Sequence, residues 1–283
     1  MSDCSDYELD HDTDDLRGTA ASRPSKARAS AGRTCCRRIS VRCSMSLAKE
    51  KRQILAEYPS CYACDAAKTS MEHAPPKCFF PEETDEKGIQ PFRRDLIKVP
   101  SCDRHNTEKS GDDVYALWHL AALDGVNDCG HMVRENLLRR IAARDWKERG
   151  GALMRRIANE IQEIDQGRPV GRTDSQRMIR FIRECAQAVY FFHTFKKLTL
   201  PLRVTNLSND FRDVAKTEIL QQRERSFDSE MGASEIHGAN PDVFNYSISE
   251  KTEQGIILVR LVFYGTLKHW IFHHPNVGPQ PST

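Results

Sequence analysis

Two short Cys/His pairs are the residues in this chain best suited to chemistry. Cys61 and Cys64 are separated by two residues, and Cys102 and His105 repeat that spacing further along. A tight turn lets two such side chains face one tetrahedral ion, and zinc prefers thiolate and imidazole donors. Together the pairs predict one structural zinc site, with four unrelated buried residues as the alternative. Cys78 is a rival fourth ligand, although its place between prolines and phenylalanines also suits a small core residue.

A second group of functional side chains lies beside these pairs. Glu72 and His73 follow the first pair, Asn106 adjoins the second, and Lys109 comes one helical turn later. A histidine can accept a proton near neutral pH, and carboxylate and amide oxygens bind hard cations such as Mg²⁺. The group therefore suggests a second, catalytic metal site next to the structural one.

The order of these motifs resembles a known family. The pattern C-x2-C, EHAPPK, RDLIKVPSC-x2-HN-x2-KS is similar to that of the HNH (His-Asn-His) nucleases of the ββα-metal fold, in their zinc-supported branch. The resemblance lies within residues 61–110 of the 283-residue chain. It implies a small zinc-stabilised ββα module that hydrolyses phosphodiester bonds of nucleic acid, most simply DNA.

The resemblance also implies a role for each residue. His73 would be the general base that takes a proton from the attacking water, and Asp95 would orient that base. Glu72 and Asn106 would hold the catalytic divalent ion, Mg²⁺ or a similar cation. Here Glu72 stands where the family usually has Asp, and Asp95 stands where the family often has Asn.

Some assignments stay open at the level of the sequence. If His105 completes the zinc site, Asn106 is the ligand of the catalytic ion; if His105 binds the catalytic ion, zinc keeps three protein ligands. The knuckle spacing favours the first alternative. Lys77 and Lys109 are candidate contacts to a nucleic-acid backbone phosphate, although lysines exposed on the surface are more common.

The hydrophobic pattern predicts an α+β fold. Pro and Gly residues between 61 and 112 favour short strands and loops, followed by a helix over 114–123. Three- and four-residue apolar spacing predicts helices over 131–166 and 174–194. The β-branched and aromatic stretches near the C-terminus predict an antiparallel sheet; they span 242–249, 255–265 and 266–275.

Three regions are expected along the chain. Residues 1–44 lack a helical or strand period and are expected to form a disordered tail. Residues 45–125, beginning with a short helix over 46–58, should form the HNH-like ββα-metal and zinc module. Residues 131–276 should form a separate domain of helices and antiparallel sheet.

Composition excludes several classes of protein. The chain is 39% hydrophobic and 29% charged, with no segment of about 20 uninterrupted apolar residues that could span a bilayer. The net charge is only +2, but residues 134–212 carry 17 Lys or Arg against 9 Asp or Glu, an excess of +8. That excess could hold a phosphate backbone, or the arginines could lie on solvated helix faces.

Cysteine usage suggests where the protein works. Ten cysteines are present and no secretory signal precedes them. Reduced thiols in the cytoplasm are therefore expected, where close cysteine pairs bind metals more often than they form disulfides. A zinc module without catalysis, binding nucleic acid or protein, is the competing function. A redox role for Cys61 and Cys64 is weaker because the pair precedes prolines and a second knuckle.

Overall fold

The computed structural model describes residues 50–123, 125–149, 155, 161–165, 168–171, 175–206, 214–251 and 255–273. The chain divides into two compact units, residues 1–57 and 58–283. In the first unit residues 50–57 are helical, as predicted, and the tail expected over residues 1–44 lies outside the described residues. The second unit contains all the elements discussed below.

The N-terminal part of the second unit follows the order strand, strand, helix. Strands β1 (Ser70–His73) and β2 (Lys98–Ser101) pair antiparallel, with Ser70 opposite Ser101 and His73 opposite Lys98. The connection contains the short 3-10 helices η1 (Lys77–Phe79) and η2 (Pro91–Arg93), and η3 (Asp103–His105) precedes helix α2 (Ser110–Ala122). Acidic Asp112 and Asp113 occupy the first turn of α2, where their negative charges interact favourably with the positive end of the helix dipole.

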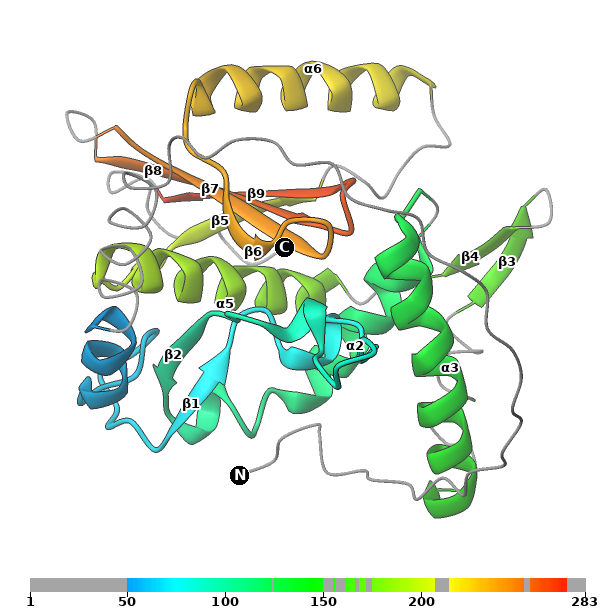
Figure 1. The fold of residues 1–283 in the computed structure, drawn as a ribbon. Helices are drawn as coiled ribbons and strands as arrows, with labels where there is room; N and C mark the ends of the chain where they lie inside the picture. The colour runs from blue at the N-terminus through cyan, green and yellow to red at the C-terminus, as the bar shows by residue number, and fades with distance from the viewer. Residues whose placement is uncertain are drawn as a thin grey trace, which may run out of the picture. The chain divides into compact units, whose positions relative to one another are not determined.

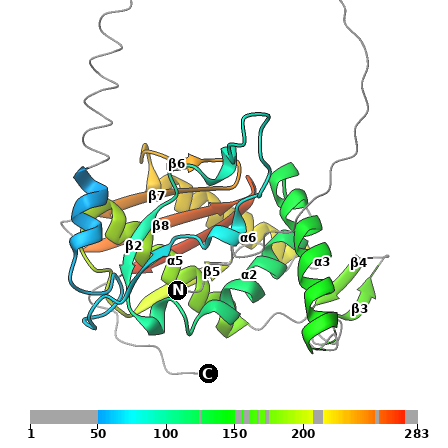
Figure 2. The same cartoon turned by 60° about the horizontal axis from the view of Figure 1, so that its bottom comes forward.

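The remaining helices are α3 (Asp128–Arg149), α5 (Ser175–Thr194) and α6 (Val214–Met231). Helix α2 packs against both α3 and α5 (Figure 2). The predictions of α2 and α5 are confirmed. The predicted helix over 131–166 is wrong at its end, because β3 (Ile161–Asp165) pairs with β4 (Arg168–Gly171) as a hairpin. Ile161 and Ile164 have a helical spacing but are too few to establish a helix, and Pro169 disfavours one.

A five-stranded antiparallel sheet forms the C-terminal part, in the order β5-β9-β8-β7-β6. Its strands are β5 (Leu202–Asn206), β6 (His237–Asn240), β7 (Phe244–Lys251), β8 (Ile256–Phe263) and β9 (Leu267–His273). Helix α5 covers one face of the sheet and α6 covers the other (Figure 1). The predicted antiparallel sheet is confirmed, and β5 and β6 extend it at its two edges.

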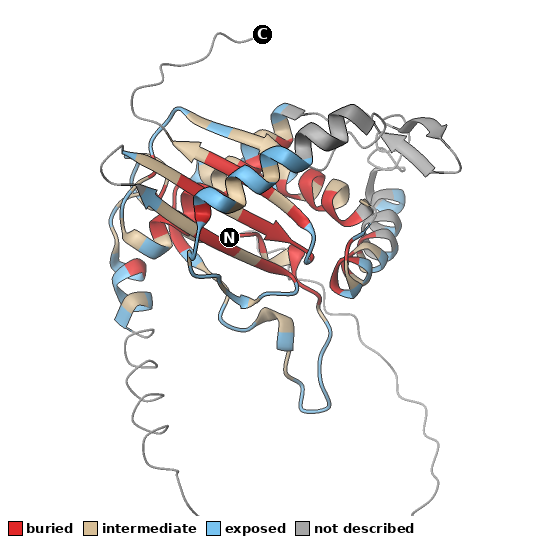
Figure 3. Ribbon diagram, turned by 90° about the horizontal axis from the view of Figure 1, so that it is seen from above, coloured by how far each residue is buried: buried red, intermediate tan, exposed pale blue. Residues whose placement is uncertain are grey.

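One hydrophobic core joins the ββα part to the sheet. Phe79 stacks on Phe181 of α5 with ring centroids 5.0 Å apart and also contacts Phe263 of β8. The Tyr264 hydroxyl donates a hydrogen bond of 3.0 Å to the carbonyl of Phe79. Buried residues are concentrated on the sheet strands and on the helices packed against them (Figure 3). The expected division between residues 125 and 131 therefore does not coincide with a break in packing.

Candidate metal centre

The four predicted ligands meet in one cluster. Cys61 and Cys64 lie in the loop before β1, Cys102 directly follows β2, and His105 ends η3. Their ligand atoms all lie within 4.8 Å of one another. His105 Nδ1 is 3.6 Å from Cys61 Sγ, 3.6 Å from Cys64 Sγ and 3.3 Å from Cys102 Sγ, and the Sγ atoms of Cys64 and Cys102 are 3.7 Å apart. The cluster can therefore hold a metal ion.

Backbone hydrogen bonds hold the first knuckle against the hairpin. Tyr62 N donates to the Pro100 carbonyl of β2 at 2.8 Å, and Cys61 N donates to the Ala66 carbonyl at 2.9 Å. From α5's C-terminal side, Lys197 Nζ donates to the Cys64 carbonyl at 2.7 Å. Both knuckles are thereby fixed to the same hairpin before any metal is considered.

The local environment of the thiols fits a cation site. Cys61 and Cys102 are buried, whereas Cys64 and His105 are half-buried. Burial raises the pKa of the Cys64 thiol to about 11, so this group needs a bound cation to be a thiolate at neutral pH. Cys78, the rival ligand, is not part of the cluster and packs against the hydrophobic core instead.

A buried group of charges lies next to the cluster. Lys109 Nζ is 2.9 Å from Glu72 Oε1 and 2.8 Å from each carboxylate oxygen of Asp113. All three residues are buried, with 7% of each residue exposed. Burial opposes the charge of Lys109, but the Asp113 and Glu72 carboxylates outweigh it and raise the pKa of Lys109. The predicted phosphate contact of Lys109 is thus revised, because its ammonium group is enclosed by carboxylates.

The other predicted site residues surround the same hairpin. His73 is the last residue of β1 and is half-buried, and Asp95 is exposed with a positive φ of 51° in the turn before β2. Asn106 follows His105 and donates a hydrogen bond of 2.7 Å from Nδ2 to Ser70 Oγ in β1. Lys77 is half-buried in η1.

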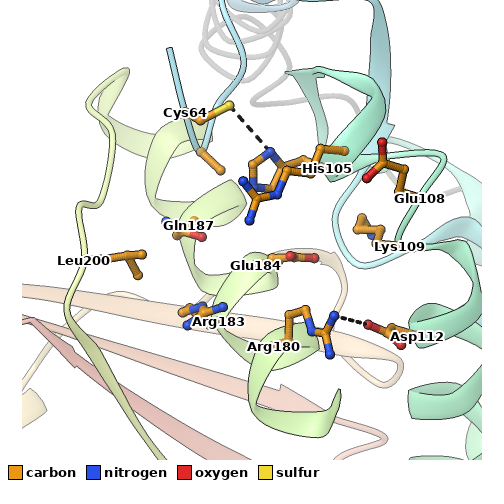
Figure 4. A pocket seen from close by; sticks show the side chains of 12 residues that line it. Cys64, His105, Glu108, Lys109, Asp112, Arg180, Arg183, Glu184, Gln187 and Leu200 are labelled. Atoms are coloured by element: carbon orange, nitrogen blue, oxygen red, sulfur yellow. Dashed lines mark hydrogen bonds and ion pairs between the residues drawn. The ribbon is translucent and has the colours of Figure 1, made fainter. Parts of the chain in front are cut away.

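A cavity of about 310 Å³ opens beside the cluster. Cys64 and His105 line one side of it, and Arg180, Arg183 and Glu184 of α5 line the other (Figure 4). His73, Glu72, Asp95 and Asn106 do not line this cavity.

The α5 side chains of this cavity were not singled out from the sequence. Arg180, Arg183 and Glu184 are polar positions on an amphipathic helix, which has the same pattern as an ordinary solvated face. The regional excess of positive charge was the only signal that pointed to them.

No protein family matches the chain, and no curated protein or solved structure is similar to it. Among the residues that the structure describes, no helix is long and apolar enough to cross a membrane.

Proposed function

We propose that the cluster of Cys61, Cys64, Cys102 and His105 binds a structural zinc ion. Zn–S bonds of about 2.3 Å and Zn–N bonds of about 2.0 Å in a tetrahedron place ligand atoms about 3.8 Å apart for two sulfurs and about 3.5 Å apart for sulfur and nitrogen. The observed separations of 3.7 Å and 3.3–3.6 Å support this geometry. Three thiolates and an imidazole also form a closed ligand set, typical of structural zinc.

On this frame we propose a metal-dependent, HNH-type nuclease that hydrolyses nucleic-acid phosphodiester bonds, with DNA as the first substrate to test. The observation that supports it best is the hydrogen bond from Asn106 to Ser70. Alternate side chains of a strand share a face, so Ser70 and Glu72 lie on one face of β1. Asn106 is therefore held at the Ser70 end of β1, on the face of the strand that carries Glu72, while His73 is the last residue of the same strand.

Each residue would have a separate task in hydrolysis. Glu72 and Asn106 would hold a Mg²⁺ or similar ion, which when bound offsets the charge that develops on the phosphate. His73 would accept the proton of the attacking water, and Asp95 would keep its ring oriented. Lys77 would contact a backbone phosphate.

A specific contact favours the second candidate, a zinc-binding module without catalysis. The Glu72 carboxylate already has a buried counter-ion in Lys109, at 2.9 Å. A carboxylate paired in this way needs no divalent cation to offset its charge. In this alternative Glu72 and His73 would serve folding, and the protein would bind nucleic acid or another protein.

The two functions are separated by a plasmid-nicking assay with added Mg²⁺ or Mn²⁺. We expect the wild type to cut and His73→Ala to lose cleavage at equal zinc content. The matched control is His131→Ala, since His131 is exposed on α3 and lies outside the proposed site. If zinc is bound stoichiometrically and neither DNA nor RNA is cut, the catalytic proposal is wrong and the binding module takes its place.

A further inference from the structure

A larger cavity, of about 770 Å³, lies along the edge strand β5 between α5 and α6. Its charged lining consists of three arginines from three different elements: Arg183 of α5, Arg203 of β5 and Arg223 of α6. Among the residues that the structure describes, no acidic side chain lines it. Phe227 and Phe272 supply part of its apolar wall. The cavity therefore combines concentrated positive charge with aromatic surface.

This cavity adjoins the smaller one beside the metal cluster. Arg183 and Leu200 line both of them, and Leu200 is 60% exposed. Arg104 and Arg180 line the smaller cavity. We call the two cavities together the arginine groove. It leads from β5 and α6 to the segment that carries His105.

Most arginines of the arginine groove form no salt bridge with the residues that the structure describes. Within the described parts of the chain, Arg104, Arg183, Arg203 and Arg223 form no ion pair. Arg180 is the exception, since it lies 3.3 Å from Asp112.

Helix α6 presents acidic side chains to the sheet and an arginine to the groove. Its acidic residues Glu224 and Asp228 contact Lys268 and Arg260 of the sheet. Arg223, in contrast, lines the groove. Glu224 and Asp228 thus hold α6 on the sheet rather than facing the groove arginines.

The negative charges of the acidic side chains that line the smaller cavity are partly offset by neighbouring positive groups. Asp112 is held by Arg177 at 2.7 Å in addition to Arg180. The Glu184 carboxylate lies near the positive charges of Lys109 and Arg183. Glu108 remains as an exposed acid at the rim. The strongest anion site is therefore the larger cavity.

We propose that the arginine groove binds a single strand of nucleic acid, with its phosphates on Arg183, Arg203 and Arg223. Guanidinium groups match phosphate geometry with paired donors, and aromatic walls accept bases irrespective of sequence. In a duplex the bases stack on one another, whereas a single strand leaves them free to stack on Phe227 and Phe272. The choice of nucleic acid as ligand rests on the proposed nuclease function.

The test is fluorescence anisotropy of a labelled DNA or RNA oligonucleotide of about 16 nucleotides, in a His73→Ala background that prevents cleavage. The variant is Arg183→Gln/Arg203→Gln/Arg223→Gln. The charge-matched control is Arg94→Gln/Arg139→Gln/Arg225→Gln, which changes three exposed arginines that do not line the groove. The single pair Arg223→Gln and Arg225→Gln, both on α6, replaces the triples if a triple variant does not fold.

We call the variant with Arg183, Arg203 and Arg223 replaced the groove triple. At about 50 mM salt its affinity for the oligonucleotide should be at least about tenfold weaker than that of the parent, and the affinity of the control triple less than about twofold weaker. The slope of log affinity against log salt should fall by about 2 in the groove triple, about 0.7 for each lost phosphate contact. Equal slopes for the two triples would overturn the proposal.

Two further arms separate the possible outcomes. Binding of a glutamate-rich peptide, lost in the groove triple while no oligonucleotide binds, would show that the groove takes an acidic peptide and that the proposal is wrong. Groove-dependent oligonucleotide binding without any cleavage by the wild type would support the groove and reject the nuclease. Cleavage with normal kinetics in the groove triple would support the nuclease and reject the groove.

Discussion

The ββα part and the five-stranded sheet share one core, but they are stabilised in different ways. The ββα part contains Glu72, Ser101, Lys109 and Asp113, which are most of the buried polar residues described in the chain. Its metal-ligand cluster lies beside them. The stability of this part should therefore respond to removal of a metal ion from the cluster, to protonation of the buried carboxylates and to substitution of a single buried charge.

The sheet is stabilised almost entirely by apolar burial. Among its fully buried side chains are Leu261, Phe263, Trp270 and Ile271. Burying such side chains contributes about 1.5–3 kcal/mol each and does not depend on pH or on a ligand. The comparison indicates that solution conditions act mainly on the ββα part, with the sheet as a stable support.

Loss of the proposed metal ion should produce the largest difference in stability between the ββα part and the sheet. Cys102→Ser removes a thiolate from the cluster, and structural zinc contributes on the order of 10 kcal/mol of binding free energy. We expect loss of stoichiometric zinc and rapid hydrogen exchange in β1 and β2, with protection retained in β7 to β9. Zinc content and amide exchange measured by mass spectrometry check this.

Cys78→Ser is the control for this variant, because Cys78 is a cysteine of the same segment outside the cluster. It should keep the zinc. If Cys102→Ser instead exposes β1 and the sheet equally, the two parts unfold as one cooperative unit and the contrast is wrong.

The buried charges should give the next largest effect. Lys109→Met leaves Glu72 and Asp113 buried without a counter-ion, which costs about 3–5 kcal/mol of unfolding free energy. Glu72→Gln should cost less, about 1–3 kcal/mol, because Lys109 keeps Asp113. Urea unfolding at neutral pH measures both values.

Protonation supplies an internal check on the Lys109→Met variant. Without the lysine the two carboxylates have raised pKa values, so acid should restore part of the lost stability below about pH 5. Lys77→Met, a half-buried lysine of η1, should change stability by less than about 1 kcal/mol. Equal costs for Lys109→Met and Lys77→Met would mean that the buried ion group does not stabilise the ββα part.

The cluster and the main elements could be predicted because their signals are local. Two residues between ligands is a spacing that the sequence displays directly, and the structure brings the four side chains together as expected. The α+β class, helices α2 and α5 and the antiparallel sheet were also predictable, since their periodicity extends over many residues. These predictions depend little on how distant segments pack.

The parts that were not predicted depend on distant contacts. Nothing local distinguishes Lys109 from an exposed helical lysine, because its burial requires β1 to place Glu72 against the start of α2. The arginine groove requires α5, β5 and α6 to come together. Strand β3 was assigned to a helix because Ile161 and Ile164 continue the three- and four-residue spacing of the preceding segment, and the pairing with β4 overrides that short local signal.

His269 of β9 is a buried titratable group of the sheet, and its predicted effect is confined to acid pH. It is 1% exposed, and neither ring nitrogen has a hydrogen-bond partner among the described residues. Its ring contacts Phe263 edge-on, with centroids 5.9 Å apart. Burial in this apolar setting lowers the pKa of His269 from 6.5 to about 4.

The sign of the pH dependence follows from that shift. Between pH 6.5 and about 4 the unfolded chain binds a proton at His269 that the folded chain does not, so stability falls as the pH falls. The full difference is about 3 kcal/mol at 1.36 kcal/mol per pKa unit. His269→Leu should remove this part of the acid sensitivity, while His131→Leu, at an exposed position, should leave it unchanged. Urea unfolding at pH 7 and pH 4.5 measures the difference; if His269→Leu loses as much stability as the wild type on acidification, the acid-sensitive groups lie in the ββα part alone and the contrast between the two regions becomes sharper.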